Sequence, residues 1–156
     1  MSQLHVTVRL AITSFALIYA AAWSAPSFAA DAGRVKVSRG SVSIQRDGKK
    51  LPAPVGAAIQ PQDTVVTGAD GAVGITFQDN SMLSAGPGST LTIDKYVYDR
   101  NTNKGEFEST LKKGTLAAIS GKMVKQTPES MKVRTPAAVM GVRGTEFVVH
   151  VAEPSK

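Results

Sequence analysis

Arg143 stands between two glycines, Gly141 and Gly144, inside a largely apolar run that spans residues 133–149. A guanidinium carries five N–H donors in a planar fork, which suits a carboxylate or another anion, and glycines let a backbone approach closely. One interpretation is therefore that Arg143 presents its charge to an anionic ligand or to a carboxylate of a partner protein.

The second interpretation makes Arg143 a half-buried internal clamp. Its donors would satisfy carbonyls at strand ends or pair with Glu146, Glu106 or Glu108. Thr145 would then cap or bridge locally. An arginine inside an apolar run needs such partners when it is buried. We favour the clamp, and on this interpretation Arg143→Met lowers the soluble yield and Tm.

Catalytic side chains are scarce in this sequence. It has no cysteine and two histidines, and beyond residue 29 the only histidine is His150. Thiol chemistry and an ordinary zinc site therefore lack their ligands. His150 shares its strand parity with Glu146 and Val148, so we expect a solvent-facing side chain rather than the base of a Ser-His-Asp arrangement.

Paired carboxylates are the remaining route to catalysis. Glu106 and Glu108 would share one face of a strand, and this is the ordinary pattern of a half-exposed strand rather than of a glycosidase. Asp70, Asp79 and Asn80 do not have the spacing of a calcium loop. We therefore predict no enzymatic activity, no metal and no cofactor.

The N-terminal segment has the composition of a secretory signal peptide. Arg9 precedes an apolar run over residues 10–23, and small residues follow, with Ser27 and Ala29 at the positions that a signal peptidase requires. The apolar run is shorter than the roughly 20 residues of a membrane-spanning helix. We expect cleavage after Ala29, no stable membrane span after it, and a protein in the periplasm or outside the cell; an uncleaved anchor is the alternative.

The charge pattern argues against nucleic acid as a partner. The formal net charge is +6, and the basic residues are dispersed, with no run longer than two. Neither a nucleic-acid-binding arm nor a polybasic membrane patch is present in the sequence. The absence of cysteine also means that packing and sheet hydrogen bonds, not disulfides, must stabilise an exported domain.

The elements that would position these residues are strands. Turn signals recur along the chain, and Val73, Ile75 and Phe77 alternate onto one face of a predicted strand. Asp47-Gly48 predicts a hairpin turn, while the prolines within residues 51–54 exclude a central strand there. The polar residues 122–130 predict a loop, and no convincing amphipathic helix is found beyond the N-terminal segment.

We therefore expect a single all-β domain of short strands, either a β-sandwich or a solenoid-like β-roll. Its last strand would close the core through Phe147, Val149 and Val151. The expected organisation is a signal peptide over residues 1–29, a short lead over 30–34, the β domain over 35–151 and a tail over 152–156.

The order of these features resembles the FecR domain over residues 35–151. Asp63-Thr64-Val65-Val66-Thr67-Gly68 precedes the strand that contains Val73, and the most distinctive block runs from Thr135-Pro136-Ala137 to Val142-Arg143-Gly144-Thr145-Glu146-Phe147. The motif residues, structural or partner-binding, are Thr135, Pro136, Gly141, Arg143, Gly144, Thr145 and Phe147.

The resemblance implies a β-rich module of the periplasm or cell surface. The best-known FecR proteins span the membrane, sense a loaded outer-membrane transporter and control a sigma factor. This sequence is expected to lack the cytoplasmic anti-sigma region, so it is similar to stand-alone exported members. We expect a non-enzymatic binding or sensing module that acts through a protein partner in the envelope. The alternative is a structural module bound to glycan or peptidoglycan, for which aromatic residues are few.

Overall fold

The computed structural model describes residues 30–144 and 146–152, and these form one all-β domain, as predicted. The strands are β1 (Gly33–Arg39), β2 (Val42–Arg46), β3 (Lys49–Pro52), β4 (Ala58–Ile59), β5 (Thr64–Thr67), β6 (Ala72–Phe77), β7 (Met82–Ala85), β8 (Thr90–Tyr98), β9 (Gly105–Ile119), β10 (Met131–Arg134), β11 (Val139–Gly141) and β12 (Glu146–Val151). A short helix, α1 (Lys122–Gln126), lies between β9 and β10.

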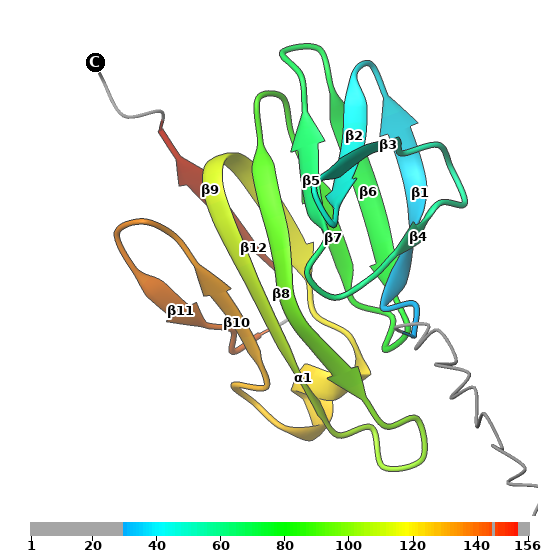
Figure 1. Ribbon diagram of the computed structural model, residues 1–156. Helices are drawn as coiled ribbons and strands as arrows, with labels where there is room; N and C mark the ends of the chain where they lie inside the picture. Colours follow the sequence, from blue (N-terminus) through cyan, green and yellow to red (C-terminus); the bar gives the residue numbers. More distant parts are fainter. Residues whose placement is uncertain (1–29, 145, 153–156) are drawn as a thin grey trace, which may run out of the picture.

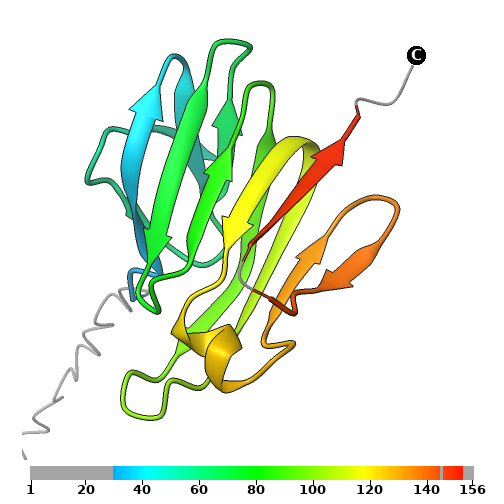
Figure 2. The ribbon, with the colours of Figure 1, turned by 180° about the vertical axis from the view of Figure 1, so that it is seen from behind.

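Strand β9 joins two layers of one curled sheet (Figures 1 and 2). Residues 105–113 pair with β8, and residues 107–110 also pair with β10. Residues 114–119 pair with β12, and 116–119 also pair with β7. The strand changes layer at Gly114, where φ is 93° and an added Cβ would stand 2.5 Å from the Cα of Ser89. Only glycine fits this position without strain.

The core fills the space between the two layers. Val73, Ile75 and Phe77 are all buried, so the predicted alternation of β6 is confirmed. Phe77 contacts Phe107 of β9 with ring centroids 4.5 Å apart, and Tyr96 of β8 meets the same ring edge-on at 5.2 Å. These aromatic contacts link both halves of the sheet across the core.

The hairpin predicted at Asp47-Gly48 joins β2 to β3, with φ of 51° and 73° at its two central residues. Such positive angles match the right-handed twist of the flanking strands. Pro52 ends β3, which pairs only with β2 among the described strands and so lies at an edge. The exclusion of a central strand at residues 51–54 is confirmed.

The prediction of a loop over residues 122–130 was wrong in part. Residues 122–126 form α1, which buries Met123 and Val124 against the core. The sequence concealed the helix because only two adjacent apolar residues mark it, and no 3.6-residue period can be recognised in five residues. Packing of Met123 against the sheet therefore decides this element. No helix among the described residues is long and apolar enough to cross a membrane.

The distinctive C-terminal run contributes to three strands, β10, β11 and β12. β10 and β11 make a hairpin, and β12 then returns to pair with the second half of β9. Phe147, Val149 and Val151 of β12 face the core as predicted, but all three are only half-buried. The last strand therefore covers the core incompletely.

Candidate functional site: an apolar cleft between two strand edges

The β10–β11 hairpin is built by the Thr135-Pro136 motif. The backbone N–H of Thr135 donates to the carbonyl oxygen of Ala138 at 2.8 Å, and the Ala138 N–H donates to Oγ1 of Thr135 at 3.1 Å. Pro136 lies in the turn, where no ladder hydrogen bond is needed. The motif thus sets the position of a hairpin that projects beside β12.

A cleft of about 560 Å³ separates this hairpin from β12. Its lining is largely apolar: Lys112, Thr135, Pro136, Ala137, Met140, Val149, His150, Val151 and Ala152. In Figure 2 the orange hairpin and red β12 diverge, so the two layers of the sheet open at this side. The cleft is the continuation of the core to the surface, because Met140, Val149 and Val151 pack against the core cluster on their inner side.

Both walls of the cleft end in a strand edge without a neighbour among the described strands. β12 pairs only with β9, and β11 pairs only with β10. The N–H of Gly86 donates to the carbonyl oxygen of Thr115, so the backbone of Thr115 faces the β7 side of β9. Because backbone groups alternate in direction along a strand, the N–H and C=O groups of Leu116 point toward β12. Those of its partner Val149 therefore point toward β9.

The backbone groups of Val148 and His150, which alternate with those of Val149, therefore point away from the sheet. The side chain of Val148 lies on the outer face and is 66% exposed. His150 is exposed as expected from its parity, with Nδ1 2.9 Å from Oγ1 of Thr115.

Arg143 is not the half-buried clamp that the sequence favoured. Its side chain is 71% exposed and forms an ion pair with Glu129, itself 58% exposed, instead of with Glu146, Glu106 or Glu108. The apolar run misled because, of residues 139–144, only Val142 is buried, being 5% exposed.

The two glycines beside Arg143 differ in what they require. Gly144 has a φ of 134°, where an added side chain would be strained, while Gly141 shows no positive φ. Oγ of Ser120 donates to the carbonyl oxygen of Gly144, which ties the β11–β12 connection to the end of β9. Thr145 lies outside the described residues.

The internal clamp is formed by a different arginine, Arg46 at the end of β2. Its Nε and Nη2 donate to the two carboxylate oxygens of Asp63, both at 2.7 Å, and Nη2 also donates to the carbonyl oxygen of Ala58 at 3.0 Å. Asp63 is 1% exposed and also accepts the N–H of Gln60 at 2.8 Å. These hydrogen bonds raise the pKa of Arg46. Nothing in the sequence spacing connects residues 46 and 63.

Glu106 and Glu108 lie in an ion-pair network on the outer face of the sheet. Lys95 contacts Glu106 at 2.5 Å, and Arg134 contacts Glu108 at 3.1 Å. Lys132 bridges the two acids, 3.8 Å from Glu106 and 3.5 Å from Glu108. The hydrogen bond from Lys95 lowers the pKa of Glu106. The pair thus has the half-exposed strand setting that the sequence predicted, with the carboxylates held by cations.

Asp79 is a buried structural carboxylate. It accepts the hydroxyl of Ser81 at 2.6 Å and the hydroxyl of Tyr96 at 3.1 Å, while its own N–H donates to Tyr96 at 3.0 Å. Burial is the main cause that raises the pKa of Tyr96, and the charge of Asp79 adds to it. Asp70 contacts the N–H of Ser41 in another turn. In the described part of the chain, no cluster of three or more potential metal ligands occurs.

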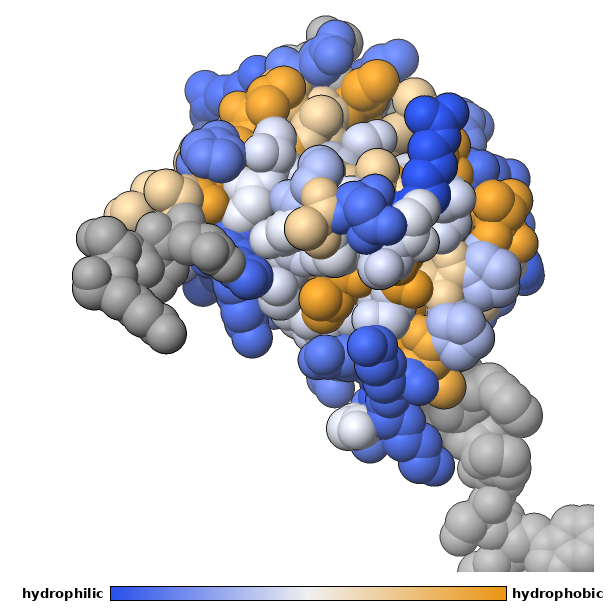
Figure 3. Space-filling view, turned by 90° about the horizontal axis from the view of Figure 1, so that it is seen from above, coloured by the Kyte–Doolittle hydropathy of each residue, from blue (hydrophilic) through white to orange (hydrophobic). Residues whose placement is uncertain are grey.

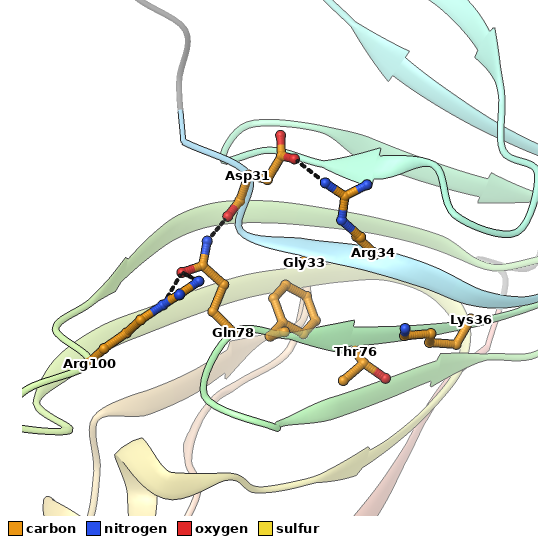
Figure 4. Close-up of a pocket in the computed structure, with 8 residues that line it drawn as sticks. Asp31, Gly33, Arg34, Lys36, Thr76, Gln78 and Arg100 are labelled. Atoms are coloured by element: carbon orange, nitrogen blue, oxygen red, sulfur yellow. Dashed lines mark hydrogen bonds and ion pairs between the residues drawn. The ribbon is translucent and has the colours of Figure 1, made fainter.

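A second, polar hollow lies where the described chain begins (Figure 4). Several of its polar groups contact one another: Arg34 pairs with Asp31 at 3.1 Å, and Nη2 of Arg100 donates to Oε1 of Gln78 at 3.1 Å. Gln78 in turn donates to the carbonyl oxygen of Asp31. Seen from above, hydrophilic and apolar residues are interspersed rather than sorted into two halves (Figure 3). The cleft beside β12 is therefore the stronger candidate for binding.

Comparison with known proteins supports the resemblance. The family model described as FecR protein matches residues 63–156, which is more than half of the chain. The match includes all three strands of the cleft region and begins at the buried Asp63. No curated protein and no solved structure matches the chain. The chain belongs to the FecR family.

Proposed function

We propose that this protein is an exported, non-enzymatic module that binds a protein partner in envelope signalling. The FecR family is involved in envelope signalling, and this supports the signalling role. The signal-peptide composition of residues 1–29 supports export to the periplasm or to the outside of the cell. The partner binds at the cleft beside β12.

The observation that carries this proposal is the position of the Thr135-Pro136 motif. The motif does not hold a reactive group; it forms one wall of a largely apolar cleft of about 560 Å³ at the open side of the sheet. Apolar lining with a few polar groups is the usual composition of a binding site. The carboxylates with catalytic potential form contacts away from the cleft: Glu106 and Glu108 pair with cations, and Asp79 accepts the hydroxyls of Ser81 and Tyr96.

A protein suits this cleft better than a glycan. Sugar rings commonly stack on exposed aromatic faces. Phe77, Tyr96 and Phe107 are buried in the core, and Phe147 is half-buried with its ring turned toward that core. The cleft itself is lined mostly by apolar residues, together with Lys112, Thr135 and His150, and none of its lining residues is Phe, Tyr or Trp.

Site-specific photo-crosslinking in cells tests the proposal. A benzophenone amino acid replaces Ala137, which is exposed and lines the cleft, and a control carries it at Val55, which is 64% exposed in the β3–β4 connection. We expect a discrete protein adduct from position 137 in the envelope fraction and none from position 55. Retention on isolated peptidoglycan without a protein adduct would instead support a cell-wall module.

Export is tested separately on the same cells. Release of the protein by osmotic shock and an N-terminus at residue 30 in the mass spectrum are the expected results. A protein that stays in the cytoplasmic fraction with residues 1–29 attached would contradict this part of the proposal.

A further inference from the structure

We infer that the cleft takes an extended, acid-bearing segment of the partner as an added strand on β12. The inference rests on the proposed protein partner and states how that partner binds. Its backbone pairs with the free edge of β12, and its alternate apolar side chains enter the cleft against Met140, Val149 and Val151.

The edge of β12 differs from the other free edges of the described sheet. β3 carries two exposed lysines and a proline, which are ordinary protections against strand pairing. β4 has two residues and β11 three, too few for a stable ladder. β12 has six residues, no lysine and no proline, and its central outer side chain is the exposed Val148. An edge of this kind is a template for another strand.

The backbone geometry specifies which groups would pair. The N–H and C=O groups of Val148 and His150 point outward from the sheet, since those of Val149 face β9. A strand placed beside them continues the layer formed by β7, β9 and β12. Such pairing demands an extended backbone from the partner, because a helix has no free hydrogen-bonding groups along its side.

The side chains of the added strand would alternate between the two faces of the sheet. Those on the inner face reach the space beside Val149 and Val151, where they complete the cover that β12 leaves open. The opposite wall of this space is Met140 on the hairpin, a flexible side chain that adapts to different apolar shapes. Apolar residues at every second position therefore fit the site.

Charge selects an acidic segment. Lys112 lines the cleft, is exposed and makes no ion pair within the described part of the chain. The neighbouring Lys132 and Arg134 are already paired with Glu106 and Glu108. A carboxylate of the partner beside Lys112 would gain a charge-assisted hydrogen bond. A second copy of this chain would bring its own β12, which carries a single carboxylate, Glu146, at one end. The oligomeric state of the protein tests that alternative.

The probe for the test is a blocked eight-residue peptide in which valine alternates with threonine and an aspartate stands at each end. Binding to the purified protein is followed by NMR. We expect saturable shifts and slowed hydrogen exchange at the amides of Val148 and His150. Two N-methylated peptides serve as controls, one methylated at the valines and one at the threonines. Because a strand presents alternate amides to opposite sides, one pattern should abolish binding and the other should not.

Two proline variants locate the edge. Val148→Pro removes an N–H that points away from β9, so the internal ladder stays intact, and probe affinity should fall by about tenfold or more. Val139 on β11 is 60% exposed, similar to Val148, so Val139→Pro is the matched control and should leave binding unchanged. Tm of both variants verifies folding. Lys112→Gln should weaken the aspartate-bearing probe several-fold and a probe without aspartate little.

Equal effects of the two methylated peptides, or of the two proline variants, would overturn strand addition. A dimer of the protein that Val148→Pro dissociates would assign the edge to a second copy and also overturn it. These outcomes are independent of the photo-crosslink at position 137: a protein adduct that persists in Val148→Pro retains the proposed function and rejects this mode of binding.

Discussion

The sequence favoured Arg143 as the internal clamp, whereas the structure gives that role to Arg46. Comparing the two arginines tests whether burial of the ion pair, rather than an apolar sequence context, decides the contribution to stability. We compare Arg46→Met with Arg143→Met, two changes that remove a guanidinium and keep an unbranched apolar side chain. Arg46 is 27% exposed and binds both oxygens of Asp63, which is 1% exposed. Arg143 is 71% exposed and pairs with an acid that is 58% exposed.

The magnitude for Arg46→Met follows from what remains around Asp63. Two short charge-assisted hydrogen bonds disappear, and the buried carboxylate keeps only the N–H of Gln60. Removing one member of a buried ion pair costs about 3–5 kcal/mol. Because Arg46 is partly solvated, we take the lower end, about 3 kcal/mol, which lowers Tm by about 10 °C for a domain of this size. Arg143→Met should cost at most about 1 kcal/mol, since its ion pair is exposed.

Urea denaturation and calorimetry give the free energy of unfolding and Tm of both variants. The double variant Arg46→Met with Asp63→Asn controls for the buried carboxylate charge that Arg46→Met leaves unpaired. Asparagine keeps an acceptor for Gln60 but carries no charge, so the double variant should be more stable than Arg46→Met alone. The reasoning is refuted if Arg46→Met melts within about 3 °C of the parent protein, or if Arg143→Met is the more damaging change.

Two further substitutions test the frame of the fold. Gly114→Ala places a Cβ against Ser89 at a positive φ and should cost about 1–3 kcal/mol or more of unfolding free energy in urea, whereas a loss below 0.5 kcal/mol would contradict the strain. Tyr96→Phe removes the phenol hydroxyl that accepts the backbone N–H of Asp79 and donates to its carboxylate oxygen Oδ1. The free energy of unfolding should fall by about 1–3 kcal/mol in the same assay. The raised pKa of Tyr96 means that the unfolded chain ionises first as pH rises, so this residue's contribution is complete below about pH 10 and declines above it. Urea unfolding from pH 9 to 11 should show a steeper alkaline loss in the parent protein than in Tyr96→Phe, and equal slopes would refute the assignment.

Local patterns predicted the elements that depend on near neighbours. The alternation of Val73, Ile75 and Phe77 identified β6, because a strand has a side-chain period of two that a buried face makes visible. Asp47-Gly48 identified the β2–β3 turn because few residue pairs adopt two successive positive φ angles. The helix α1 escaped prediction because its stability comes from packing Met123 against residues distant in the chain.

Two of the residues that line the cleft could be named from the sequence, but the shape of the cleft could not be predicted. Thr135 and Pro136 were recognisable as motif residues from their order alone, and both line the cleft. The cleft exists because the parallel pairing of β10 with β9 carries the hairpin away from β12. This pairing joins residues far apart in the sequence, so no local pattern encodes it.

The sequence by itself determined the all-β class and the turn residues, since both depend on backbone preferences and on alternation within a few positions. The family was recognisable from the order of its motif residues. Only the tertiary structure decided which arginine is the clamp. Burial is a property of the assembled layers. Arg46 at the end of β2 meets the buried Asp63, which precedes the neighbouring strand β5. Near Arg143 only Val142 is fully buried, and the guanidinium is exposed to water. The free edge of β12 was decided in the same way, by which strands lie beside it.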